Sequence, residues 1–136
     1  PRLARSWAWA ADSLSVRFAL DPRARWHDGR PVRGGDVAFS FRLAADPRAA
    51  SPVAPLLANV DSVTAPDSAT AVVWFARRSP QQFFDAVYHL YVLPEHRLRD
   101  VAPGRLAASP FAREPVGSGR FRFVRWERGQ RLELEA

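Results

Sequence analysis

The stretch that decides the middle of the fold is residues 26–41, Trp-His-Asp-Gly-Arg-Pro-Val-Arg-Gly-Gly-Asp-Val-Ala-Phe-Ser-Phe. Its first half predicts a turn, because Asp28-Gly29 is typical turn chemistry and Pro31 restricts the chain that follows. In this interpretation Asp28 accepts local backbone hydrogen bonds and Trp26 packs beneath the turn. The segment thus brings the chain round before the next regular element.

The second half, from Gly34 to Asp46, fits two patterns. Alternating apolar residues would suit a strand, while Val37 and Phe41 also have helical spacing. We favour a helix that begins near Asp36, whose carboxylate suits the positive end of a helix. Asp46-Pro47 ends it, since the residue before proline disfavours the helical conformation.

Strands are predicted on both sides of this helix. Residues 14–20 alternate between apolar and polar side chains, which indicates a half-buried strand. Residues 60–65 and 70–76 flank a Pro-Asp-Ser turn and predict a hairpin. A second hairpin is predicted from residues 120–126 and 131–135 around Arg128-Gly129-Gln130.

Short helices complete the expected fold. One follows Ser51-Pro52, with Ser51 as its N-cap. Another opens at Ser79-Pro80 and places Phe83, Phe84, Val87 and Tyr88 at core-facing spacing. One or two helical turns are expected in residues 94–100, and a loop with at most a short helix in 102–115. The fold class is therefore α+β, a small mixed domain of antiparallel hairpins and several short helices.

The composition is that of one globular domain, with 136 residues, 47% hydrophobic and 25% charged. The net charge of +6 raises nucleic acid as a partner, but all 20 basic residues are Arg and they are spread among 14 acids. We therefore expect no nucleic-acid partner, and an Arg-rich nucleic-acid binder remains only a remote alternative. The absence of Cys excludes disulfides and thiolate zinc sites.

Three groups of residues invite a chemical interpretation. His27-Asp28 lacks a recognisable nucleophile, so a catalytic triad does not follow. His89 and His96 are seven residues apart, which does not match a helical metal pair. Gly117-Ser118-Gly119 lacks the Lys of a P-loop, and a tight chain crossing that needs Gly for its dihedral angles is the simpler interpretation. We expect no catalytic residue, no metal site and no cofactor.

The aromatic residues leave two alternatives open. Phe83-Phe84 with Tyr88 and Tyr91 could form a stacking surface for a ligand or could be core. Trp7 and Trp9 could cover an interface with another part of the protein, in which case the isolated chain would self-associate.

The order of several short motifs resembles the bacterial extracellular solute-binding proteins of family 5, the dipeptide, oligopeptide and nickel receptors of ABC importers. The resemblance covers essentially the whole chain and includes the opening Leu3-Ala4-x-Ser6-Trp7, the Asn59-Val60 hairpin and Leu93-Pro94-x-His96. The residues that carry the signature are Trp26, Asp28, Gly29, Pro31, Asp36, Val37, Phe41, Gly117, Gly119 and Trp126.

The resemblance implies a two-lobed receptor of the periplasmic-binding-protein type II class, of which residues 1–136 would be the smaller inserted domain. Residues 1–13 and 118–136 would be strands that join it to a first lobe outside this sequence. The whole protein would capture peptides or similar small solutes for an ABC permease, from the periplasm or the outer surface of a membrane. Membrane attachment would be only through a lipid anchor. The alternative is a structural or interaction domain that buttresses the binding lobe or contacts the permease.

Two positions depart from the family pattern. Arg33-Gly34 stands where Thr-Ala is usual, so we expect Gly35 or Asp36 to take over the N-cap. In oligopeptide receptors an aromatic residue after Ser-Pro reaches the ligand. Here Ser51 and Pro52 are followed by Val53, which would offer an apolar wall instead.

Overall fold

A computed structural model describes residues 3–136. Four strands form the main sheet: β1 (Ala4–Trp9), β2 (Ser15–Leu20), β3 (Val60–Asp67) and β4 (Thr70–Phe75). The helices are α1 (Gly34–Ala45), α2 (Gln82–Phe84) and α3 (Glu95–Leu98), with a π-helical segment η3 (Asp85–His89) and 3-10 turns η1 (Pro47–Ala49), η2 (Ala54–Leu57), η4 (Pro103–Ala108) and η5 (Pro110–Ala112). A separate hairpin, β5 (Arg122–Glu127) and β6 (Arg131–Glu135), ends the chain.

The main sheet is wholly antiparallel, with strand order β1-β2-β4-β3. Val73 of β4 lies opposite Val16 of β2 on one side and Val63 of β3 on the other. The predicted strand at 14–20 and both predicted hairpins are confirmed. The hairpin of β3 and β4 is longer than expected, because its pairing continues to Asp67.

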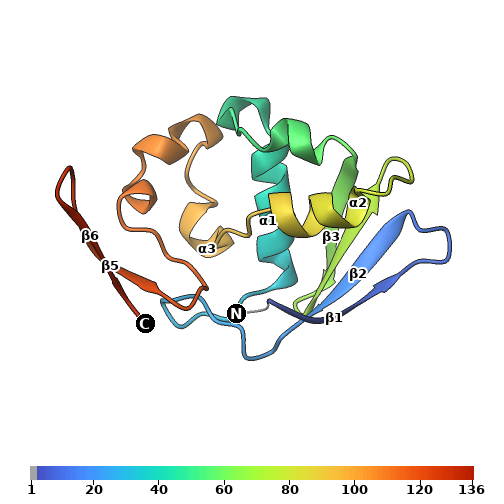
Figure 1. Cartoon of the computed structure of the whole chain (residues 1–136), viewed down its shortest axis with the longest axis horizontal. Helices are drawn as coiled ribbons and strands as arrows, with labels where there is room; N and C mark the ends of the chain where they lie inside the picture. The colour runs from blue at the N-terminus through green and yellow to red at the C-terminus, as the bar shows by residue number, and fades with distance from the viewer. Residues whose placement is uncertain (1–2) are drawn as a thin grey trace.

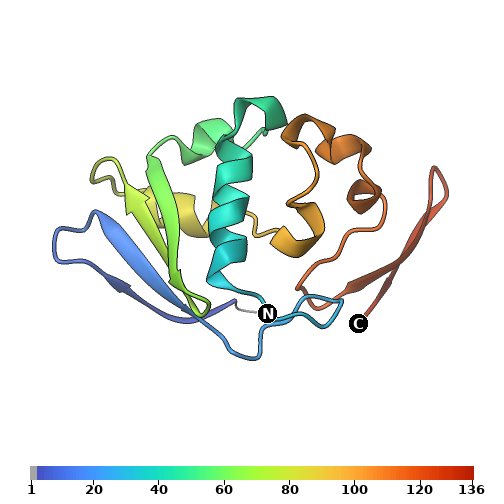
Figure 2. The ribbon, with the colours of Figure 1, turned by 180° about the vertical axis from the view of Figure 1, so that it is seen from behind.

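The core lies between this sheet and α1, which crosses one face of it (Figure 1). Alternate residues of β4, Ala71, Val73 and Phe75, are buried there, as period two requires. Val37 and Phe41 of α1 meet them at helical spacing. Seen from behind, α1 stands between the sheet on one side and the helical turns α3, η4 and η5 on the other (Figure 2). The α+β prediction is therefore confirmed.

The start of α1 differs from the prediction. Its N-cap is Arg33, not Gly35 or Asp36, and the helix begins at Gly34. Asp36 occupies the third helical position, where its carboxylate accepts the backbone N–H of Arg33 at 2.8 Å. The missing hydroxyl cap is thus replaced from inside the helix, which allows the earlier start.

The region after α1 also differs from the prediction. Ser51 is not an N-cap, because the next helical element is the 3-10 turn η2, whose N-cap position is Val53. Ser51 contributes its backbone carbonyl, which accepts the N–H of Ala54 at 3.2 Å. Asp46, at the end of α1, caps η1 by accepting the N–H of Arg48 at 2.9 Å.

The helix expected from Ser79-Pro80 changes type along its length. After one short turn, α2 passes into the π-helical segment η3. The buried face of this segment carries Gln82, Ala86 and Leu90, which are spaced by four residues. Phe84, Val87 and Tyr88 lie on the other face and are exposed, so their expected core placement was wrong.

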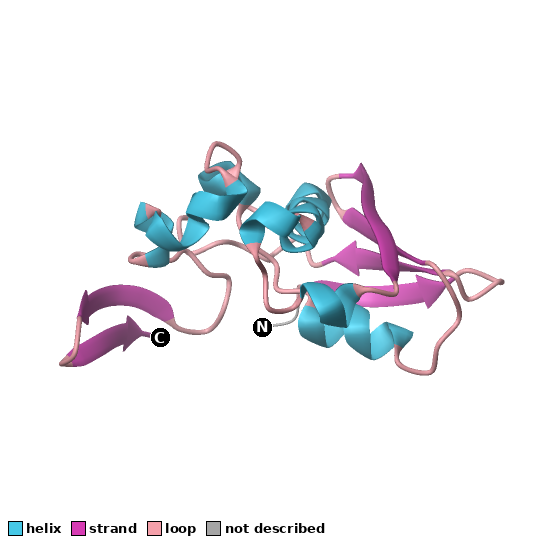
Figure 3. Ribbon diagram, turned by 90° about the horizontal axis from the view of Figure 1, so that it is seen from above, coloured by secondary structure: helices cyan, strands magenta, loops and turns pink. Residues whose placement is uncertain are grey.

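The C-terminal third consists of short helical turns and the isolated hairpin. The predicted turns at 94–100 and the loop-rich region at 102–115 correspond to α3, η4 and η5. The β5–β6 hairpin projects from the side of the molecule opposite the main sheet, as the view from above shows (Figure 3). None of the helices in residues 3–136 has the length and apolar character needed to cross a membrane.

Gly34 and Gly35 provide a matched test of how α1 meets the sheet. A Cβ at Gly34 would overlap the backbone carbonyl of Thr70, whose carbon would be 2.9 Å away, whereas at Gly35 it would meet only the flexible carboxylate of Glu95 at 3.2 Å. We expect Gly34→Ala to cost about 2 kcal/mol or more. Gly35→Ala should lie within about 1 kcal/mol of the unmodified chain, on the stabilising side. Urea unfolding measures both, and equal effects would contradict this account.

Candidate functional site

The turn at residues 26–29 is formed as predicted. Gly29 has a φ of 87° and donates its N–H to the carbonyl of Trp26 at 2.9 Å. Asp28 accepts the backbone N–H of Arg30, and Trp26 is only 2% exposed. Pro31 follows in an isolated bridge with Arg25, which closes the base of the turn.

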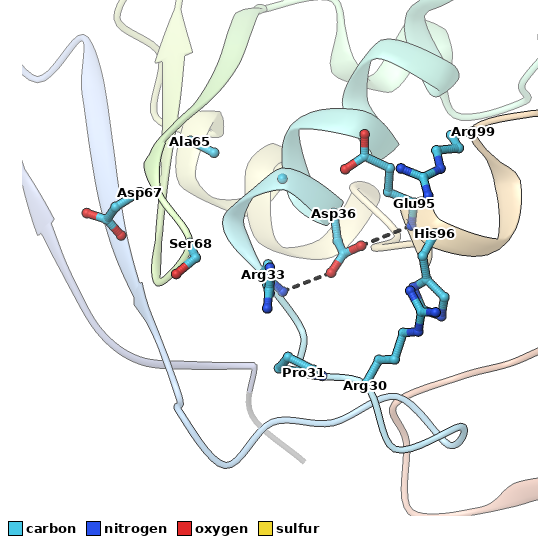
Figure 4. Close-up of a pocket in the computed structure, with 11 residues that line it drawn as sticks. Arg30, Pro31, Arg33, Asp36, Ala65, Asp67, Ser68, Glu95, His96 and Arg99 are labelled. Carbon is cyan, nitrogen blue, oxygen red and sulfur yellow. Dashed lines mark hydrogen bonds between the residues drawn. The ribbon is translucent and has the colours of Figure 1, made fainter.

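Asp36 joins this turn to two other segments. Its buried carboxylate accepts the indole N–H of Trp26 at 3.2 Å and the backbone N–H of Arg33 at 2.8 Å. The other oxygen accepts the backbone N–H of Glu95, at the start of α3, at 2.9 Å. Figure 4 shows the bonds to Arg33 and Glu95. One side chain therefore holds the turn, the start of α1 and the start of α3 together.

Ser40 adds a second link one helical turn further along. Its hydroxyl donates to the carbonyl of Asp36 at 2.6 Å and accepts the backbone N–H of Leu93 at 2.7 Å. Ser40 is 1% exposed, so both bonds are shielded from water. The extended segment before α3 is thereby fixed along α1.

His27 connects the turn to the Gly117–Gly119 segment. Its backbone N–H donates to the carbonyl of Gly117, and its Nε2 lies 2.8 Å from the carbonyl oxygen of Gly119, so Nε2 carries the proton. Neither glycine has a positive φ, so the expectation that they supply special dihedral angles was wrong. A Cβ at Gly117 would come within 3.2 Å of the His27 ring, so close approach explains that glycine. Nothing in the structure explains Gly119 in the same way.

Asp28 also reaches α3, where its carboxylate lies 2.7 Å from Nε2 of His96. Partial burial raises the pKa of Asp28, but hydrogen bonds from His96 and from the Arg30 N–H, with the charges of His96 and Arg97, outweigh it. The net result is a pKa of Asp28 below its ordinary value.

The other signature residues occupy two places. Val37 and Phe41 belong to the core. Trp126, on β5, is 46% exposed and lines a groove together with His27 and Gly117. All the signature residues therefore hold the fold together or border the hairpin.

One groove lies at the start of α1 and has a volume of about 660 Å³ (Figure 4). Its charges are mixed: Arg30, Arg33, Arg99 and His96 face Asp36, Asp67 and Glu95. The described residues contain no cluster of three or more His, Cys, Asp or Glu that could hold a metal ion.

A second groove, of about 550 Å³, lies beside η3 and is apolar. Its walls include Phe18 and Leu20 of β2 on one side and Val87, Tyr88 and Tyr91 on the other, and Ser118 also borders it. Tyr88 is 62% exposed and Tyr91 is 67% exposed. Of the two alternatives left open for these aromatics, core packing is wrong for Phe84, Tyr88 and Tyr91, which are exposed, whereas Phe83 packs against the core. A stacking surface for a ligand stays a prediction. The spacing of these residues alone did not show which face of the helical segment meets the sheet.

The expected ligand contacts lie elsewhere. Val53 is half-buried and packs against the hydrophobic core at the start of η2. Of the two residues that precede Val53, Ser51 is half-buried and Pro52 is exposed. None of the three lines either of these two grooves. Their contact with a ligand stays a prediction.

Asp36 can be tested by removing its charge alone. Asp36→Asn keeps the size of the side chain but turns an N–H donor toward groups that are themselves donors. We expect a loss of about 3 kcal/mol in the free energy of unfolding. Asp12→Asn is the control, because Asp12 accepts a single N–H, from Leu14, in an exposed turn. In urea unfolding, the free energy of unfolding of Asp36→Asn should be well below that of Asp12→Asn, and the reverse order would refute this role of Asp36.

The pair of Asp28 and His96 predicts a response to pH. Because the pKa of Asp28 is depressed in the folded chain, its contribution to stability is present above the unfolded pKa and is lost as the pH falls through the folded value. His96→Ala should raise the pKa of Asp28 and shift acid unfolding to higher pH. Carbon-detected NMR of the Asp28 carboxyl measures the first effect, and an unchanged titration would rule out the coupling.

The chain is similar to known proteins over its whole length. The family model described as "Bacterial extracellular solute-binding proteins, family 5 Middle" matches residues 1–136. A Brucella ovis protein assigned as an ABC transporter peptide-binding protein is 36% identical over 135 residues, covering 98% of this chain and 25% of that protein. This chain therefore spans about a quarter of the length of the curated relatives that it matches first.

Solved structures share the fold. NikZ from Campylobacter jejuni, in complex with Ni(L-His), superposes with a TM-score of 0.87 at 29% identity, over 100% of this chain and 27% of NikZ. The oligopeptide-binding protein AppA from Bacillus subtilis, in complex with a nonapeptide, gives a TM-score of 0.91 at 24% identity, over 99% of this chain and 27% of AppA. The chain belongs to the bacterial extracellular solute-binding proteins of family 5.

Proposed function

We propose that the natural protein carrying this sequence captures peptides outside the cytoplasm and delivers them to the permease of an ABC importer. The observation that carries this proposal is the family match over all of residues 1–136. The Brucella ovis relative, assigned to peptide binding, favours peptides over other solutes. The family is one of binding proteins, and we assign no catalytic role to this chain.

We propose further that this chain is the smaller inserted domain of the receptor, joined through residues 1–13 and 118–136 to a lobe outside the sequence. The β5–β6 hairpin supports this arrangement. Its Leu132 and Leu134 line a groove between the hairpin and the rest of the domain but remain more than half exposed, and a two-stranded hairpin is barely stable on its own. A further lobe packed on the hairpin would bury them.

The alternative is a domain that buttresses the binding lobe or contacts the permease without touching ligand. The hydrogen bonds of Asp36, Ser40 and His27 favour it, because each of these side chains joins separate segments of this domain. Trp7 is 56% exposed, and an exposed aromatic surface of this kind would lead the isolated chain to self-associate. Attachment to the membrane by a lipid anchor belongs to the same proposal for the whole protein.

Calorimetry on the full-length natural protein tests the proposal. Peptide pools of two to nine residues should bind, and Ni(L-His), the ligand of NikZ, should not displace them. Heat only with Ni(L-His) would contradict the peptide assignment. The isolated chain of residues 1–136 serves as the control for ligand contacts made outside this domain, and we expect it to give little or no heat.

A further inference from the structure

We propose that the apolar groove beside η3 receives an uncharged apolar side chain of the peptide ligand. The inference rests on the proposed peptide-binding function and deepens it. We call Phe84, Tyr88 and Tyr91 the aromatic ledge, because these side chains project from the segment that forms one wall of the groove.

The ledge lies on the face of the helical segment that points away from the core. Gln82, Ala86 and Leu90 follow one another at intervals of four residues and are buried, whereas Phe84 and Tyr88, also four residues apart, are exposed on the other face. The segment includes the π turn η3, and π turns are frequently found at functional sites.

Tyr88 is held in place although it is exposed. Its ring stacks on Phe84 with centroids 4.6 Å apart, and the ring of His89 meets both edge-on at 5.2 and 5.3 Å. A side chain fixed in this way loses little freedom when a ligand packs on it. Tyrosine supplies broad contact at low entropic cost, and its hydroxyl remains free for the polar backbone of a peptide.

The chemistry of the groove selects the occupant. No Arg, Asp, Glu or His lines it, although a quarter of the chain is charged, whereas the groove at the start of α1 is lined by charges of both signs. Its floor is made of core residues, including Val37 and Val73, so it is already formed without ligand. Its volume of about 550 Å³ is that of a small-ligand pocket. Apolar walls with hydroxyls of Tyr88, Tyr91 and Ser118 suit an uncharged side chain next to a peptide bond.

The test compares three tripeptides on the full-length natural protein: Ala-Phe-Ala, Ala-Ala-Ala and Ala-Glu-Ala. We expect tightest binding of Ala-Phe-Ala. Tyr88→Ala and Tyr91→Ala should each reduce the preference for Ala-Phe-Ala over Ala-Ala-Ala about tenfold, the effect of losing one aromatic contact. Trp74→Ala is the matched control, since Trp74 is 44% exposed but lies on the other side of β4 from Val73, and it should leave the preference unchanged.

Each outcome separates the two proposals. If the unmodified protein binds the tripeptides but both Tyr variants keep the preference, the groove is not the subsite, while peptide binding stands. If the variants instead lose several degrees of thermal stability without ligand, another part of the protein covers the groove, which also overturns the inference. If no peptide binds the unmodified protein, both proposals fall. Tyr88→Phe and Tyr91→Phe, which keep the rings, should retain the preference and show that the variants fold.

Discussion

The buried carboxylate of Asp36 is the constraint on which the rest of the structure depends. Its three hydrogen bonds come from the side chain of Trp26 in the preceding turn, from the backbone of Arg33 at the helix start, and from the backbone of Glu95, 59 residues further along the chain. A buried carboxylate is costly unless its oxygens are satisfied, so the geometry of all three segments is fixed at once. The start of α1, the turn before it and the approach to α3 can therefore vary only together.

The local elements could be predicted because their causes are local. Asp28-Gly29 formed its turn, and the alternation around Val73 and across β5–β6 produced the strands. The start of α1 was misplaced by two residues, because the carboxylate that replaces the cap lies inside the helix, at Asp36. That substitution follows from a contact between Asp36 and Arg33 that spacing alone suggests only weakly.

The candidate site could be predicted only in part, because it depends on contacts between distant segments. The aromatic residues near position 88 were recognised, but their exposure depends on which face of the helical segment packs against the sheet, and the spacing of Phe84 and Tyr88 does not decide that. The groove beside them joins β2 to η3, about seventy residues apart in sequence. His27 and Gly119 are also far apart in sequence, so Gly119 could be recognised as a signature residue but its hydrogen bond with His27 could not be predicted.

The side chains that hold this domain together are not the side chains that line the apolar groove. The side chains of Trp26, Asp36 and His27 form their hydrogen bonds with other groups of this domain. Replacing any of them would therefore lower the free energy of unfolding, whatever the ligand is. The hydroxyls of Tyr88 and Tyr91 make no hydrogen bond within the described residues 3–136, and both side chains line a preformed apolar groove. Substitutions there should cost the fold little, because exposed side chains contribute little to stability. A domain built in this way can keep its framework while the side chains that line the groove change.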